Sequence, residues 1–192
     1  ALEVAEAVKT LQGHGPDDFH GHCVEVAAYM LKLAGQGDKW TDIEVNRADV
    51  DRVLKQGQGF DRFHQMIEAQ GGDVGQVDDL SKLPQATLIE PITAEESGYI
   101  QDVFADKVGI ASLALGAGRA KKGDPIDFAV GIEVHVSVGD PVNAGDTLMT
   151  LHANDEVALN NAKQILSTSV TMSDATVAPI PLFYGVVDGA DV

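Results

Sequence analysis

Residues 115–124 gather the residue types that can hold an anion. Their sequence is LGAGRAKKGD, so three of the chain's 13 basic residues (Arg119, Lys121 and Lys122) fall within four positions of a glycine-rich stretch. Basic side chains attract phosphate and carboxylate groups, and glycine lets backbone N–H groups approach them. The spacing matches neither G-x-G-x-x-G nor G-x-x-x-x-G-K-[ST]. An anion-binding loop and a plain surface loop therefore both remain open.

Two histidines and the single cysteine also stand close together. His20, His22 and Cys23 carry imidazole and thiolate groups, which are zinc ligands. An apolar stripe predicts a helix from residue 17 up to Gly35, however, and helix neighbours one or two apart point to different faces. We therefore expect a solvated helix face here rather than a metal site.

Residues 138–148 carry the pattern V-G-D-x-V-x-x-G-D-x-L. It resembles the strand–turn–strand of biotinyl and lipoyl carrier domains, in which glycines allow tight corners of a flattened barrel. Carriers also need a lysine at an exposed hairpin tip. No lysine lies between Lys122 and Lys163, and Lys163 falls in a predicted helix. The pattern thus predicts a barrel-like architecture without carrier chemistry.

The elements that position these motifs change character near residue 80. Before it, apolar residues recur at helical spacing and each run stops near a glycine. Thr41 and Glu44 form a capping-box pattern at the start of the third run. The four expected helices begin near residues 2, 17, 41 and 60 and end before Gly13, Gly35, Gly57 and Gly71.

Beyond Pro84 the pattern is that of short strands followed by helices. Alternating apolar and polar residues predict strands, and the apolar stripe after Asp155 predicts a capped helix. We expect an α+β fold whose second part, residues 84–192, contains a barrel-sandwich-like antiparallel sheet. The expected strands are 87–93, 98–104, 132–138 and 147–152, two strand-like runs end the chain, and the expected helices are 108–115 and 155–166.

Composition narrows the classes of partner. Acidic residues outnumber basic ones 30 to 13 over 192 residues, for a formal net charge of −17. Nucleic acids and anionic membranes are bound through Lys and Arg, so we expect neither as a partner. With 44% apolar residues the chain can bury a core. A lone cysteine favours a reducing, cytoplasmic location. The sequence starts at Ala1 inside a predicted helix, and we therefore expect it to be part of a longer protein.

Six segments together resemble the pyrimidine-nucleoside and thymidine phosphorylase family. Their order and spacing agree with the family over nearly the whole chain, which is far more specific than any single motif. The segments are 1–7 (ALEVAEA), 11–18 (LQGHGPDD), 30–35 (MLKLAG), 63–73 (FHQMIEAQGGD), 115–127 (LGAGRAKKGDPID) and 138–148 (VGDPVNAGDTL).

The resemblance implies a glycosyltransferase (a pentosyltransferase) of pyrimidine metabolism and nucleoside salvage. Such enzymes convert a pyrimidine nucleoside and phosphate into the free base and a pentose 1-phosphate, as cytoplasmic homodimers that require no cofactor. Residues 1–83 would be the last helices of the large α/β domain, and residues 84–192 the C-terminal α+β domain. The phosphate- and base-binding motifs precede this stretch in the family. We therefore expect no catalytic residue within the chain, and no activity from the chain alone.

The resemblance also implies one ligand. Glu6 matches the second glutamate of the family's ALEV-x-E segment, and in family members this glutamate is a ligand of a monovalent cation such as potassium. The alternative is that Glu6 is an ordinary exposed glutamate of a helix. The loop with Arg119, Lys121 and Lys122 is expected to face the large domain and help close the cleft. The competing hypothesis for the whole chain is a non-catalytic, carrier-like barrel module that docks on a partner.

Overall fold

Two compact units divide the chain in the computed structural model, which describes residues 1–35, 40–119 and 121–187. One unit, Glu3–Leu83, is helical, and the other combines Ala1–Leu2 with Pro84–Val192. Every strand of the described chain belongs to the second unit. The mixture of helices and antiparallel sheets confirms the predicted α+β class. None of the described helices is long and apolar enough to cross a bilayer.

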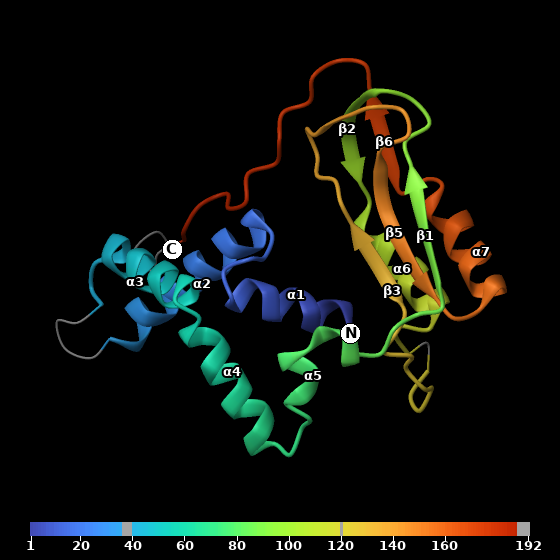
Figure 1. Cartoon of the computed structure of the whole chain (residues 1–192). Helices are drawn as coiled ribbons and strands as arrows, with labels where there is room; N and C mark the ends of the chain where they lie inside the picture. Colours follow the sequence, from blue (N-terminus) through green and yellow to red (C-terminus); the bar gives the residue numbers. More distant parts are fainter. Residues whose placement is uncertain (36–39, 120, 188–192) are drawn as a thin grey trace. The chain divides into compact units, whose positions relative to one another are not determined.

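The helical unit forms where the apolar periodicity predicts it (Figure 1). Asp17 and Asp18 occupy the first turn of the second helix, where the helix dipole favours negative charge. Gly13, with a φ of 81°, ends the turn after the first helix in a conformation that favours glycine. From Glu3 onward the unit contains α1 (Leu2–Leu11), α2 (Asp17–Ala34), α3 (Ile43–Lys55), α4 (Gln58–Ala69), the short α5 (Gly75–Asp78) and the 3₁₀ turn η1 (Leu80–Lys82).

The start of α3 differs from the predicted capping box. The helix is capped by Asp42, whose Oδ1 accepts the N–H of Glu44 at 2.9 Å and that of Val45 at 3.4 Å. The prediction of Thr41 as the cap was wrong by one residue. Threonine and aspartate are both good caps and stand side by side here, so the pattern alone could not choose between them.

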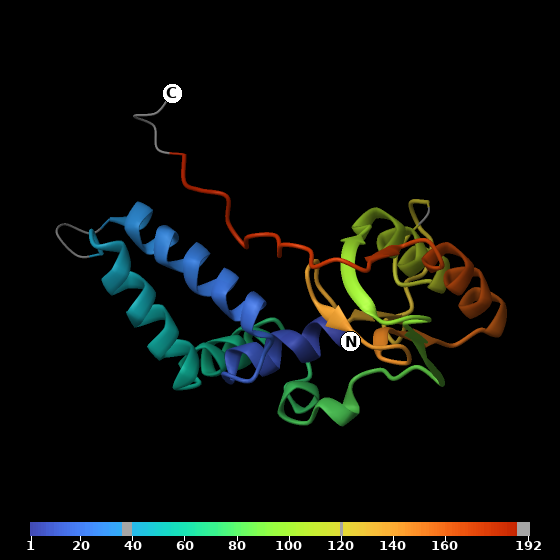
Figure 2. The same ribbon diagram turned by 90° about the horizontal axis from the view of Figure 1, so that it is seen from above.

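Helices α2 and α3 lie side by side (Figure 2). Asn46 of α3 is fully buried, and its amide donates to the Ala28 carbonyl at 3.3 Å and to the Trp40 carbonyl at 2.9 Å. The Arg47 guanidinium binds Glu25 across the pair, with Nη2 2.6 Å from Oε1. This hydrogen bond lowers the pKa of the Glu25 carboxyl below its usual value. Polar contacts therefore fix the register of the two helices.

One face of α2 nevertheless carries exposed apolar side chains. Val26, Met30 and Leu33 are 42%, 64% and 86% exposed. Spacings of three and four residues place them on one side of the helix. The apolar side chains of this unit that are buried are few: Val8, Ala28, Leu54, Val77 and Leu83. We call Val26, Met30 and Leu33 the α2 stripe.

The second unit is built from two three-stranded antiparallel sheets. Strands run in the order β1-β5-β3 in one sheet and β4-β2-β6 in the other. The chain crosses between the sheets right after β1, because β2 pairs with β4 and β6 instead. The elements are β1 (Leu88–Thr93), β2 (Gly98–Val103), α6 (Ala105–Leu115), β3 (Gly131–Val134), β4 (Pro141–Val142), β5 (Thr147–Ala153), α7 (Glu156–Leu166) and β6 (Val170–Ser173).

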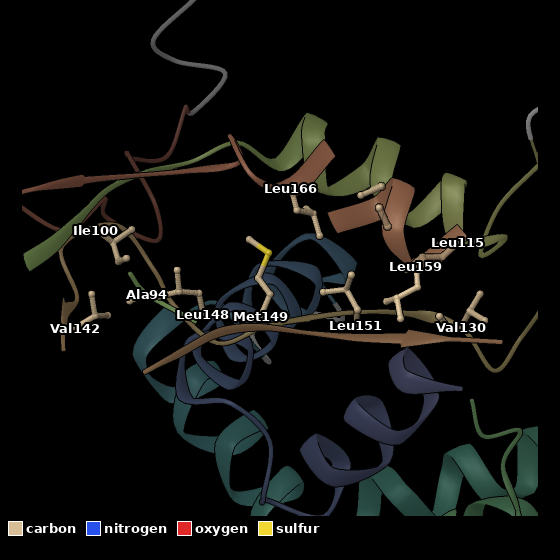
Figure 3. Packing of buried hydrophobic residues seen from close by; sticks show 13 residues of the cluster. Ala94, Ile100, Leu115, Val130, Val142, Leu148, Met149, Leu151, Leu159 and Leu166 are labelled. Atoms are coloured by element: carbon tan, nitrogen blue, oxygen red, sulfur yellow. The ribbon is translucent and has the colours of Figure 1, made fainter. Parts of the chain in front are cut away.

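The core of this unit lies between the central strand β5 and the helices. Figure 3 shows Met149 and Leu151 of β5 pointing toward the helix layer, with Leu159 and Leu166 of α7 among the residues that meet them. Met149 and Leu151 are 1% and 0% exposed, so the strand is buried on this side. Helices α6 and α7 pack against each other over it. The predicted helix after Asp155 is confirmed, and the Asp155 Oδ1 caps it by accepting the N–H of Ala158 at 2.8 Å.

Two strand predictions need correction. Strand β3 ends at Val134 rather than near residue 138, because Asp140 takes the N–H of Ser137 at 2.7 Å and closes a turn there. Of the two strand-like runs expected at the end of the chain, β6 forms, whereas residues 174–187 form neither helix nor strand. Because the strands divide into two separate sheets, the barrel-sandwich-like detail stays a prediction.

Candidate functional site

The cationic loop, residues 116–127, joins α6 to the segment before β3. Its two ends are held together, since the N–H of Asp127 donates to the Gly116 carbonyl at 3.0 Å. Gly116 has a φ of 99°, a left-handed conformation that lets the chain leave α6 sharply. The two ends of the loop therefore lie next to each other, joined by this hydrogen bond. Arg119, Lys121 and Lys122 are all exposed on it.

A tight turn fixes part of the loop. The Asp124 Oδ2 accepts the N–H of Lys121 at 2.8 Å, and the N–H of Asp124 donates back to the Lys121 carbonyl at 3.1 Å. Gly123, between them, has a φ of 100°. The side chains of Lys121 and Lys122 therefore project from an ordered turn rather than from an arbitrary coil.

The same turn occurs twice more, in residues 137–140 and 143–146. Asp140 accepts the N–H of Ser137 at 2.7 Å, and Asp146 accepts that of Asn143 at 2.8 Å. In both turns the residue before the aspartate is a glycine with a φ above 90°. One x-x-Gly-Asp device thus shapes both corners of the carrier-like pattern and the tip of the cationic loop.

The turn changes how the loop can meet an anion. The Asp124 carboxylate already occupies the Lys121 N–H, so this backbone donor is not available to a phosphate. None of Arg119, Lys121 and Lys122 forms an ion pair with another residue that the structure describes. Among the other described Lys and Arg residues, five form ion pairs with carboxylates: Arg47, Arg52, Lys55, Lys82 and Lys163. The loop therefore offers an anion the side-chain charge of three cations, whereas the Lys121 N–H is already taken.

A polar network supports the base of the loop. The Asp127 Oδ2 accepts from the Asn154 amide at 2.8 Å, and its Oδ1 accepts the Ala129 N–H at 2.9 Å. The Asn154 side-chain Oδ1 in turn accepts the Thr87 N–H at 2.9 Å. The Asn154 hydrogen bond, followed by that of Ala129, lowers the pKa of the Asp127 carboxyl. Asp127 is charged at neutral pH and ties the loop to the ends of β1 and β5.

A hollow of ≈ 520 Å³ lies against this base. Phe128, at one side of it, is 67% exposed. Aromatic and proline side chains give the hollow an apolar wall close in sequence to the three cations. The lining residues are Pro84, Gly116, Pro125, Ile126, Asp127 and Phe128.

The other predicted candidates do not assemble into a site. His20, His22 and Cys23 lie on α2, where the His20 Nε2 is 2.8 Å from the Asp51 Oδ1. Burial raises the pKa of the Cys23 thiol, which makes it a poorer thiolate ligand and nucleophile. Within the described residues no three His, Cys, Asp or Glu side chains are placed to hold a metal ion.

Glu6 lies on α1 with its side chain exposed. One carboxylate is too few ligands for a cation, and no second carboxylate, His or Cys pair joins it within the described part of the chain. The role of Glu6 as a cation ligand stays a prediction.

Lys163 cannot serve as a carrier lysine in this arrangement. It lies within α7, as predicted, and its Nζ forms an ion pair with Glu90 of β1. A carrier lysine has to stand free at a hairpin tip. The interpretation of residues 138–148 as architecture without carrier chemistry is consistent with this placement.

Sequence reasoning missed two features of this unit. One is the Asp127–Asn154–Thr87 network, whose members are 27 and 67 positions apart. The other is a second hollow of ≈ 740 Å³ between the end of β1, the end of α7 and β6, with Met149 and Met172 in its lining. Only the strand pairing brings such distant residues together, and no local pattern signals it.

Comparison with known proteins agrees with the order of the motifs. Residues 99–173 match the pyrimidine nucleoside phosphorylase C-terminal domain. The pyrimidine-nucleoside phosphorylase of Geobacillus stearothermophilus is 41% identical over 184 residues, which are 96% of this chain and 42% of the relative. The chain belongs to the pyrimidine-nucleoside phosphorylase family.

Two further relatives carry the same name. The Bacillus subtilis (strain 168) protein is 44% identical over 156 residues, which are 81% of this chain and 35% of the relative. The Staphylococcus aureus (strain USA300) protein is 36% identical over 179 residues, 93% of this chain and 40% of the relative. The chain thus spans less than half of the length of these phosphorylases. Its matched domain runs from Tyr99 in β2 to the end of β6 and includes the whole cationic loop.

Proposed function

We propose that the chain is the C-terminal part of a pyrimidine-nucleoside phosphorylase. The reaction is pentosyl transfer, in which a pyrimidine nucleoside and phosphate give the free base and a pentose 1-phosphate; thymidine and uridine are the candidate nucleosides. The observation that carries this proposal is the match of 96% of the chain, at 41% identity, to a protein of that name. The same proposal places the enzyme in cytoplasmic nucleoside salvage as a homodimer.

The groups that hold phosphate and base belong, in this proposal, to the part of the relatives that the chain does not span. Within the described residues no three His, Cys, Asp or Glu side chains are placed to hold a metal ion, and the Asp124 carboxylate already occupies the Lys121 N–H. Catalysis of such a transfer rests on positioning and on stabilising an oxocarbenium-like sugar between base and phosphate. The present chain supplies support and charge to that site, not the reacting groups.

The cationic loop is the part of this chain that acts on the substrates. Arg119, Lys121 and Lys122 stand unneutralised in a chain of net charge −17, so they are the natural attraction for a phosphate dianion. The base of the loop is held by the Asp127 N–H to the Gly116 carbonyl and by the Asp127 carboxylate to Asn154, so the three cations are presented from a fixed point. We assign the loop the role of closing over the phosphate side of the cleft.

Changing all three cations to alanine tests this role. In the full-length protein, Arg119→Ala, Lys121→Ala and Lys122→Ala together should raise the phosphate KM or lower kcat by about tenfold, since screened charge of this kind contributes about 1 kcal/mol or more. The effect should shrink as ionic strength rises. Changing Lys9, Lys55 and Lys82 to alanine removes the same charge elsewhere and serves as the control. Unchanged phosphate kinetics in the loop variant would remove the loop from the mechanism.

The reaction itself is tested with the full-length protein, thymidine or uridine, and phosphate. Base release should depend strictly on phosphate and be matched one to one by pentose 1-phosphate. Base release in the absence of phosphate would show hydrolysis and contradict the proposal.

The Glu6→Gln variant of the full-length protein, assayed across a potassium titration, tests the role of Glu6 as a cation ligand. A higher potassium requirement is expected if Glu6 is a ligand, and an unchanged requirement if Glu6 is a surface residue.

A further inference from the structure

An extended apolar tail follows β6. Its residues 174–187 belong to no helix or strand. Four alternate side chains of the tail are apolar and at least half exposed: Ile180 (59%), Leu182 (50%), Tyr184 (87%) and Val186 (58%). Val187, whose side chain would point to the opposite face, is 82% exposed. Successive side chains of an extended chain point to opposite faces, so both faces of this tail are apolar. Such a segment in water calls for a partner.

The fold fixes where the tail begins. Gly139 has a φ of 97°, and a Cβ on it would lie 3.0 Å from the Pro179 nitrogen and 3.1 Å from the Val177 carbonyl oxygen. The tail backbone therefore crosses the corner before β4 in close contact. The exposed apolar stretch starts at the next residue, so the unit presents it from a defined point.

Two prolines decide which edge of the tail can pair. Along a strand, the N–H groups of residues two apart point to the same side in the plane of the sheet. Pro179 and Pro181 have no N–H. The edge of the tail formed by the odd-numbered residues therefore has no hydrogen-bond donors at these two positions. Ile180, Leu182 and Tyr184 keep their donors on the other side. This is the composition of an edge strand with its proline side outward.

Apolar side chains on both faces indicate a sheet that is covered on both sides. The described chain offers no such sheet, because its strands form two sheets that each carry an exposed face residue, such as Ile89 at 57%. Over half of the length of the relatives has no counterpart in the chain. The α2 stripe is a second, independent apolar face that still needs a cover.

We propose that residues 180–187 form an edge strand of a sheet contributed by the part of the phosphorylase polypeptide outside this chain. This inference rests on the proposed function. The tail adds through the N–H groups of Ile180, Leu182, Tyr184 and Val186, and leaves its proline side to solvent. It then works as a strap that ties the unit carrying the cationic loop to that sheet.

Hydrogen exchange of the tail amides, measured residue by residue, tests the proposal. In the full-length protein the N–H groups of Ile180, Leu182 and Tyr184 should exchange about tenfold or more slower than in this chain alone, while Gly185 stays fast. Fast exchange of the Ile180, Leu182 and Tyr184 amides in the full-length protein would overturn the strap. Equally slow exchange of these amides in the chain alone would also overturn the strap. Slow exchange that depends on protein concentration would show that the tail pairs with a second copy, and slow exchange that does not would show that it pairs within the chain.

A pair of variants at one position separates the hydrogen bond from the side chain. Leu182→Pro removes the donor as well as the side chain, whereas Leu182→Ala removes only the side chain. The full-length Leu182→Pro variant should lose the slow exchange at Ile180 and Tyr184, and Leu182→Ala should retain it. Equal behaviour of the two variants would contradict strand pairing. Phosphorolysis is measured separately, so an inactive protein with a protected tail would contradict only the proposed function.

Discussion

At the residue scale, the candidate site depends most on Asp127, which holds the base of the cationic loop in place. Its carboxylate joins the loop base to Asn154 and to the Ala129 N–H, and these hydrogen bonds lower its pKa. A carboxyl whose pKa is lower in the folded state stabilises the fold above its unfolded pKa of about 3.9, and this contribution is lost as pH falls through the folded value.

The Asp127→Asn variant should therefore be less stable at pH 7 by about 1 kcal/mol, since the new side chain has one acceptor oxygen and either the Asn154 amide or the Ala129 N–H would face its NH2 group instead. The difference from the parent should shrink below about pH 4, because the parent loses its own contribution there. Urea unfolding at pH 7, 5 and 3.5 measures both effects. Asp174→Asn, at an exposed position, is the control. A stability difference that stays constant from pH 7 to 3.5 would refute the assignment.

Residue patterns predicted some local chemistry and missed the rest for a physical reason. The x-x-Gly-Asp turns are local, and the sequence marks them with glycine and aspartate at fixed spacing. Asp127 finds its partner 27 positions away. Nothing in the neighbourhood of Asp127 distinguishes it from the many other acidic residues of the chain.

At the element scale, helix capping offers a direct test of the second unit. Asp155 caps α7 through the N–H of Ala158, and α7 covers β5 in the core. Asp155→Ala should lower the free energy of unfolding by about 1 kcal/mol. Asn161→Ala, at an exposed position inside the same helix, should leave it unchanged or raise it by a few tenths of a kcal/mol. Thermal unfolding followed by circular dichroism measures both, and equal effects would contradict the capping role.

Helices were predictable because their signal is repeated within a few turns. Helices α1 to α4 and α7 form where the apolar periodicity places them, and α6 (Ala105–Leu115) includes the short helix expected over 108–115, for which no stripe was present. Strand β3 was overestimated because alternation continues through residue 138 while Asp140 diverts the backbone at Ser137. Pairing order was not predictable, because β1 and β2 are neighbours in sequence yet lie in different sheets.

At the scale of the whole molecule, charge and apolar surface point to a larger assembly. A net charge of −17 opposes self-association and repels phosphate, and the cationic loop places three bases together against this charge. The α2 stripe and the tail leave apolar surface exposed on both units. The relatives are more than twice as long as this chain. In the proposed phosphorylase, the rest of the polypeptide covers the α2 stripe and the tail and supplies the phosphate site.

Phosphorolysis by the chain alone and by the full-length protein, assayed side by side, tests the central claim most directly. Thymidine and uridine are incubated with phosphate, and base and pentose 1-phosphate are measured together. The account predicts phosphate-dependent turnover by the full-length protein and none above background by the 192-residue chain. Turnover by the chain alone would contradict it, because the reacting groups would then lie within the residues described above.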